Sequence, residues 1–90
     1  MNINFNKIAK NLQPIIDNDA IEYNENEICI FLGTHCISAS IEDDEVNINV
    51  ENQDNATSAF DHDFKNDLGW NTTPTDAVEK MLIALISIYN

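Results

Sequence analysis

The chain contains no arginine and only four lysines among its 90 residues, against 16 aspartates and glutamates, so its formal net charge is −12. A surface of this charge repels nucleic acid and anionic membranes and attracts basic surfaces. We therefore expect no direct binding to nucleic acid or to a membrane, and we expect a basic protein as the partner. The alternative is that the acidity serves solubility alone.

Glycine, proline and cysteine occur only twice each. Gly33 and Gly69 cannot form the glycine-rich loop that holds phosphates in nucleotide-binding proteins, and two cysteines are too few for a disulfide framework. No apolar run follows Met1 or is long enough to span a bilayer, so we expect neither a signal peptide nor a membrane helix, and a cytoplasmic protein. The length suits a single domain over residues 1–90.

The middle of the chain predicts an antiparallel β-meander, because apolar residues alternate there with period two. If Gly33-Thr34 forms a two-residue hairpin loop with a type II′ turn, Ile30 faces Ile37. If residues 42–45 form the next loop, Ile37 also faces Val50. A slip of one residue would bring alternate asparagines into the core, so the register is strongly specified. Four strands are predicted near residues 20–24, 27–32, 35–41 and 46–51, and a fifth at 58–64 would add Phe60, His62 and Phe64 to the apolar face.

Two helices flank the meander. In the first, Asn4 is the predicted N-cap, Phe5, Ile8 and Leu12 recur at helical spacing, and Pro14 ends the element or starts a separate turn. The second begins at the N-cap Thr73 and is apolar over more than half of its surface. Such a wide arc predicts packing on the sheet and against the first helix, with a homodimer as the alternative. We favour a monomer in an α+β fold, with four to five antiparallel strands and both helices packed on one face.

No group of residues predicts catalysis or a bound metal or cofactor. In Asp61-His62-Asp63 the carboxylates share one strand face and the imidazole lies on the other, so one strand cannot offer all three to a single ion. Cys29 and Cys36 are diagonal neighbours in the predicted register, beyond easy disulfide reach. We expect them to be buried, reduced thiols, and we expect the protein not to be an enzyme.

The register also defines a second, polar sheet face that no helix is left to cover. Carboxylates at positions i and i+2 of a strand lie about 6.6 Å apart, a spacing similar to that of successive phosphates. A rigid acidic sheet can therefore imitate a nucleic-acid backbone. The predicted partner-binding residues lie on this face and on the hairpin tip beside it: Glu42, Asp43, Asp44, Glu45, Glu51, Asp61 and Asp63.

In size, acidity and α+β build, the chain resembles the small phage-encoded inhibitors of bacterial defence, including anti-CRISPR proteins. The stretch from Gly69 to Ala77 is similar to the Thr-Pro helix start near the end of many small phage proteins. The resemblance implies a non-catalytic inhibitor that occupies the basic nucleic-acid-binding site of a partner, such as a CRISPR effector. The alternative is a structural or adaptor protein of phage or bacterium that interacts through its apolar C-terminal helix or Trp70.

Overall fold

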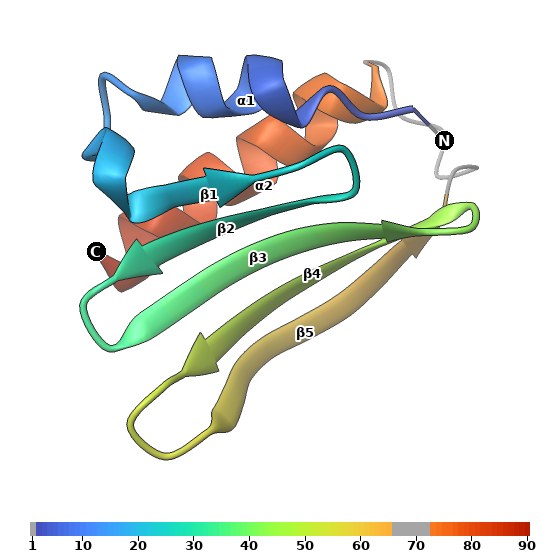
Figure 1. Ribbon diagram of the computed structural model, residues 1–90. Helices are drawn as coiled ribbons and strands as arrows, with labels where there is room; N and C mark the ends of the chain where they lie inside the picture. The colour runs from blue at the N-terminus through green and yellow to red at the C-terminus, as the bar shows by residue number, and fades with distance from the viewer. Residues whose placement is uncertain (1, 66–72) are drawn as a thin grey trace.

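A computed structural model describes residues 2–65 and 73–90 and shows the predicted α+β fold (Figure 1). One helix lies near each end of the chain, and an antiparallel five-stranded sheet lies between them. The elements in chain order are α1 (Phe5–Leu12), the short 3₁₀ helix η1 (Asn18–Ala20), β1 (Ile21–Tyr23), β2 (Glu27–Leu32), β3 (His35–Glu42), β4 (Glu45–Asn52), β5 (Thr57–Lys65) and α2 (Pro74–Tyr89).

The sheet is a simple meander in the order β1-β2-β3-β4-β5, and its register is the predicted one. Ile30 pairs with Ile37, which pairs in turn with Val50. All three side chains are fully buried. The asparagines that alternate with the buried residues of β4 lie on the other face, as period-two alternation requires.

Two-residue turns set this register. Gly33 has a φ of 58°, a conformation that costs glycine little. Thr34 is not among the residues of positive φ, in keeping with a type II′ turn. The second turn is tighter than predicted: Glu42 ends β3, Glu45 begins β4, and the two face each other. Only residues 43 and 44 form the loop, with Asp43 at a φ of 55°.

The fifth strand is confirmed, and it is longer than predicted. Along β5, Phe64 pairs with Val46 and Phe60 pairs with Val50. The pairing then shifts by one residue beside Val50, because Glu51 faces Ser58. A β-bulge of this kind puts one extra residue into a strand and increases its local twist.

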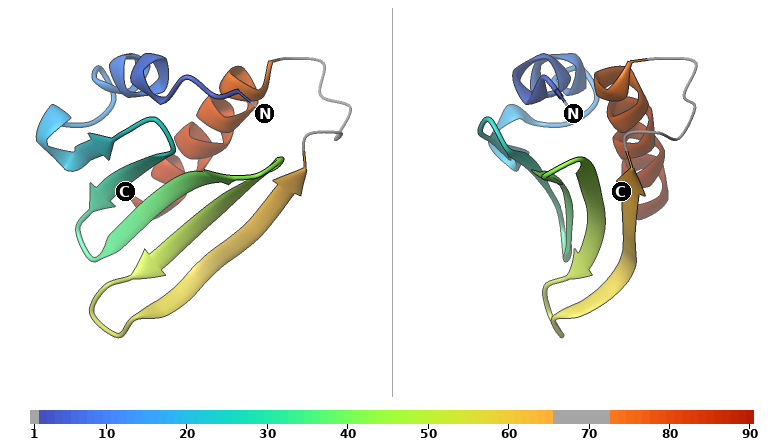
Figure 2. Two further views of the ribbon diagram at one scale, coloured as in Figure 1. Left: turned by 45° about the vertical axis from the view of Figure 1, so that its right-hand side comes forward. Right: turned by 90° about the vertical axis from the view of Figure 1, so that its right-hand side faces the viewer.

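Both helices begin at their predicted caps. The side chain of Asn4 accepts a hydrogen bond from the Lys7 amide at 3.0 Å, and that of Thr73 accepts one from the Asp76 amide at 3.2 Å. These bonds satisfy N–H groups that have no partner within the helix. Both helices lie on the same side of the curved sheet, α1 against β1 and β2, and α2 against β3 (Figure 2).

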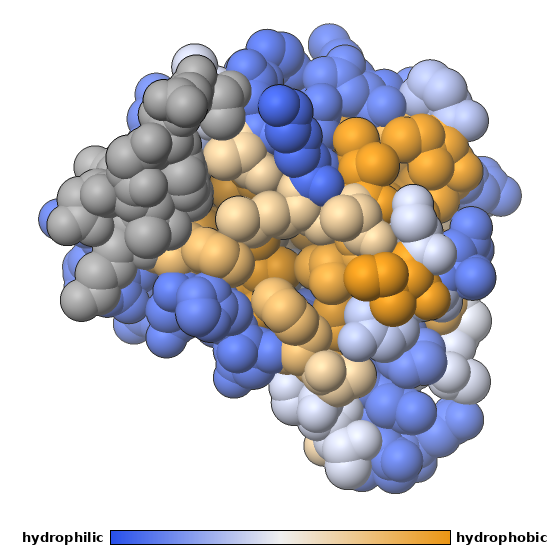
Figure 3. Space-filling model, turned by 180° about the vertical axis from the view of Figure 1, so that it is seen from behind, coloured by the Kyte–Doolittle hydropathy of each residue, from blue (hydrophilic) through white to orange (hydrophobic). Residues whose placement is uncertain are grey.

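One hydrophobic core joins the helices to the sheet. Helix α2 packs against both α1 and β3, as its wide apolar arc predicted. The helix still leaves apolar surface uncovered, because Ile88 is 69% exposed. Apolar residues gather across the side of the molecule on which α2 lies (Figure 3).

Candidate interaction surface

The sheet face opposite the helices, here called the open face, is polar and carries carboxylates across its width. The strand pairing aligns its side chains in rows that run across the sheet. One row contains Glu22, Cys29, Ser38, Asn49 and Asp61 in that order. The next contains Glu27, Ser40, Asn47 and Asp63. Neither described helix covers this face, because the core places both on the opposite side.

At one end of the open face, the β3–β4 turn and Asp63 surround an acidic hollow. Its volume is about 470 Å³. The residues that line it are Glu42, Asp43, Asp44, Glu45, Asn47 and Asp63. The structure thus brings five of the seven predicted contact residues to one place, although they come from the turn and from a strand about twenty residues further along the chain.

Asp61 is connected to the residues of the hollow by hydrogen bonds from Asn47. The Asn47 side-chain amide donates to a carboxylate oxygen of Asp61 at 2.7 Å and to one of Asp63 at 2.8 Å. Asn47 thereby holds two carboxylates of β5 in place without adding charge. An amide that supplies two donors is suited to this task.

Glu51, the seventh predicted residue, lies apart from the hollow. It pairs with Cys36 and with Ser58, near the bulge in β5. The sequence-based list omitted two further carboxylates of the open face, those of Glu22 and Glu27. Both follow from the predicted register, because Glu22 faces Cys29 and Glu27 faces Ser40.

Positive charge is segregated from the open face wherever the structure describes lysine side chains. Lys7 and Lys10 are in α1, and Lys80 is in α2. The Lys7 ammonium lies 3.8 Å from the Asp76 carboxylate of α2. The helical side therefore contains cations that offset its acids, whereas the charged side chains that the structure describes on the open face are all carboxylates.

The two cysteines are free thiols, as predicted, but they are half-buried on the open face rather than buried. They lie there because residues 29 and 36 alternate with the core positions of β2 and β3. Partial burial, together with repulsion of the thiolate by Cys36 and Glu27, raises the pKa of Cys29 to about 11. Burial also raises the pKa of Cys36. A thiol that stays protonated at neutral pH is a weak nucleophile.

The side chains of Asp61-His62-Asp63 divide between the two faces as predicted. His62 pairs with the core residue Ile48, and its ring lies 4.4 Å from that of Phe64, whereas both aspartates face asparagines. Within residues 2–65 and 73–90, no group of three metal-ligating side chains has the geometry of a metal site. Trp70 lies outside the described residues. Among the described helices, none is long and apolar enough to cross a membrane.

Comparison with models of protein families, with curated proteins and with solved structures found no match.

Proposed function

We propose that this protein is a non-catalytic inhibitor that binds the basic nucleic-acid-binding site of another protein and keeps nucleic acid out. The observation that carries the proposal is the placement of charge. The register directs carboxylates of all five strands to one face, and the acidic hollow adds those of the turn residues Asp43 and Asp44. The described lysine side chains lie on the helices instead.

The geometry suits imitation of a nucleic-acid backbone. Asp61 and Asp63 lie on one face of β5, two residues apart, and share the Asn47 amide. Their carboxylates are thus held in fixed positions on a rigid sheet, and less conformational entropy is lost on binding than with mobile side chains. Lysines and arginines that line a nucleic-acid channel are the complementary surface. A CRISPR effector is the example that the anti-CRISPR resemblance supplies.

Reversal of charge at the hollow tests the proposal. We expect Glu42→Lys/Glu45→Lys to slow association with a purified Cas9-type effector at least tenfold and to reduce its salt dependence. The melting temperature should stay the same or rise, because the two substitutions change the net charge from −12 to −8 and so reduce the self-repulsion of the fold. Displacement of labelled DNA from the effector, measured by fluorescence anisotropy, would report the inhibition.

The matched control carries the same change of charge away from the hollow. Asp19→Lys/Asp54→Lys alters two exposed residues, one in η1 and one in the β4–β5 turn at the opposite end of the strands. Glu79 is unsuitable as a control, because it accepts a hydrogen bond from Asn11 at 2.8 Å and so links the helices. Equal loss of association in both double variants, or association that persists at about 1 M salt, would refute the nucleic-acid mimic.

A structural or adaptor role through α2 is the second candidate. The exposed fraction of Ile88, 69%, favours it. Under this alternative, Ile88→Ser would abolish binding of a partner and the charge reversals would leave binding unchanged.

A further inference from the structure

The long outer edge of the sheet is the feature that the acidic surface does not explain. Strand β5 runs over residues Thr57–Lys65, and among the described strands β4 is its one neighbour in the sheet. Natural proteins shield such edges because unpaired N–H and C=O groups pair readily with another strand. The other edge strand, β1, covers only Ile21–Tyr23. The two edges thus differ greatly in the length that they offer to a partner strand.

The direction of the backbone groups in β5 can be traced from one hydrogen bond. The Ile41 amide donates to the Asn26 carbonyl at 2.8 Å, so the backbone N–H and C=O groups of Ile41 in β3 point toward β2. Direction alternates along an antiparallel strand. The backbone N–H and C=O groups of Ser40 therefore point toward β4, and those of its partner Asn47 point back toward β3. In β4, the backbone N–H and C=O groups of Ile48 must then point toward β5.

The partner of Ile48 in β5 is His62, whose N–H and C=O groups consequently point toward β4. The backbone N–H and C=O groups of its neighbours Asp61 and Asp63 point in the opposite direction. Their backbone groups point outward, to the free edge. Asp61 and Asp63 therefore combine an outward backbone with carboxylates on the open face.

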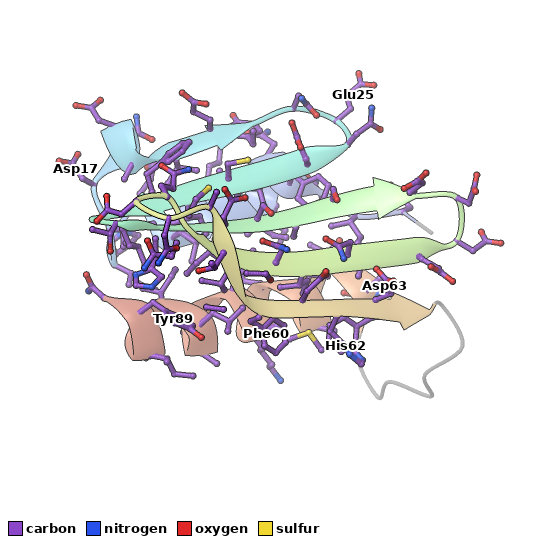
Figure 4. All side chains as sticks on the ribbon, turned by 90° about the horizontal axis from the view of Figure 1, so that it is seen from below. Asp17, Glu25, Phe60, His62, Asp63 and Tyr89 are labelled. Carbon is purple, nitrogen blue, oxygen red and sulfur yellow. The ribbon has the colours of Figure 1, made fainter. Side chains whose placement is uncertain are left out.

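The two faces of β5 differ in chemistry. By the strand register, Asp61 and Asp63 face the open side, and Phe60 and His62 face the side of the helices. Figure 4 shows Asp63 on one side of β5 and Phe60 and His62 on the other. Phe60 is 36% exposed, and no helix is packed closely against β5 in the described residues. A strand added at this edge would place alternate residues beside aspartates and beside phenylalanine.

We propose that β5 is a docking edge for an extended segment of another protein in which basic and apolar residues alternate. The segment pairs antiparallel with residues 60–64, its main chain bonded to Asp61 and Asp63. Its lysines or arginines lie beside those two carboxylates, and its apolar residues extend the surface of Phe60 and Phe64. Main-chain bonds supply affinity in this mode of recognition, and the side chains supply specificity.

A second copy of this chain fits the edge less well. In antiparallel registers centred on residue 61 or 62, Asp61 lies opposite an aspartate of the copy. Like charges directly opposite each other destabilise a strand pair, and each copy has a net charge of −12. Charge complementarity therefore assigns the edge to a basic segment.

Hydrogen exchange with a defined probe tests the docking edge. The probe is a short peptide in which lysine alternates with valine, and the control peptide has the same residues in two blocks. We expect the alternating peptide to slow exchange at the Asp61 and Asp63 amides, while the His62 amide is already protected in the free protein. Equal effects of the two peptides, or no slowing at these two amides, would overturn the proposal.

Two substitutions of Asp63 distinguish the contribution of its backbone N–H group to peptide binding from the contribution of its charge. Asp63→Pro removes the outward N–H and is tolerated at a strand edge, whereas Asp63→Asn removes only the charge. Affinity for the alternating peptide should fall about tenfold more in Asp63→Pro than in Asp63→Asn. Equal affinities of the two variants would overturn the docking edge, as would a dimer of the wild-type protein that Asp63→Pro dissociates.

This inference deepens the proposed function, since both require a basic partner, but the two can fail separately. Loss of effector binding in Glu42→Lys/Glu45→Lys, with equal effector binding by Asp63→Pro and Asp63→Asn, would retain the acidic hollow and exclude the edge. The reverse result would retain the edge and exclude the nucleic-acid mimic.

Discussion

A single charge placed on either face of the sheet tests the register most directly. Ile30 in β2 is fully buried among core residues, whereas Ser38 of the neighbouring strand β3 lies on the open face between Cys29 and Asn49. Ile30→Asp removes a buried isoleucine side chain and places a carboxylate in the core. Ser38→Asp adds the same carboxylate to a face that already carries several.

The expected losses in the free energy of unfolding differ between the two variants by several kcal/mol. Loss of the buried Ile30 side chain costs about 1.5–3 kcal/mol, and an unpaired buried carboxylate adds several more. A domain of this length has a free energy of unfolding of roughly 5–13 kcal/mol. Ile30→Asp should therefore leave the protein largely unfolded. Ser38→Asp should cost less than about 1 kcal/mol, the usual range for surface substitutions.

Circular dichroism with urea denaturation measures both variants, and Ile30→Ala supplies a graded change if Ile30→Asp does not fold. The alanine variant should lose about 2–5 kcal/mol, which lowers the urea midpoint by roughly 2 M for a protein of this size. The register would be wrong if Ser38→Asp lost as much stability as Ile30→Ala.

Three further predictions concern the open face, the second helix and the oligomeric state. Alkylation of the two thiols of the wild-type protein should continue to accelerate above pH 9, since the pKa of Cys36 is raised and that of Cys29 is raised to about 11; a plateau near pH 9 would contradict this. Thr73→Ala should lower the free energy of unfolding by about 1 kcal/mol in urea titrations, because the Asp76 amide loses its acceptor, and Thr73→Ser should restore most of it. Light scattering at micromolar concentration should give the monomer mass of 10.2 kDa; twice that mass would indicate that the apolar surface near Ile88 is covered by a second copy.

The same carboxylates that we assign to binding also affect stability. Glu42 faces Glu45 across the β3–β4 turn, and Asp61 and Asp63 share one amide. Proteins often retain unfavourable arrangements at functional sites, where a partner relieves them. A basic partner that neutralises these charges would stabilise the fold as it binds.

The register could be predicted from the sequence because three local signals agree. Gly33 fixes one turn, the acidic residues 42–45 contain the next, and the isoleucines between them alternate with period two. Any slip moves every buried side chain of a strand to the opposite face, so no other pairing is energetically close. The helix caps Asn4 and Thr73 are predictable for a similar reason, because a cap acts within three residues of its own position.

The tertiary structure decided the features that depend on distant parts of the chain. The bulge beside Val50 shifts the end of β5 by one residue, and no local pattern announces it. The hydrogen bond from Asn11 to Glu79 and the exposure of Phe60 follow from where α2 lies on the sheet. That position results from the simultaneous packing of two helices and the sheet around one core. Periodicity specifies which face of a helix is buried, but it cannot specify which strands that face covers.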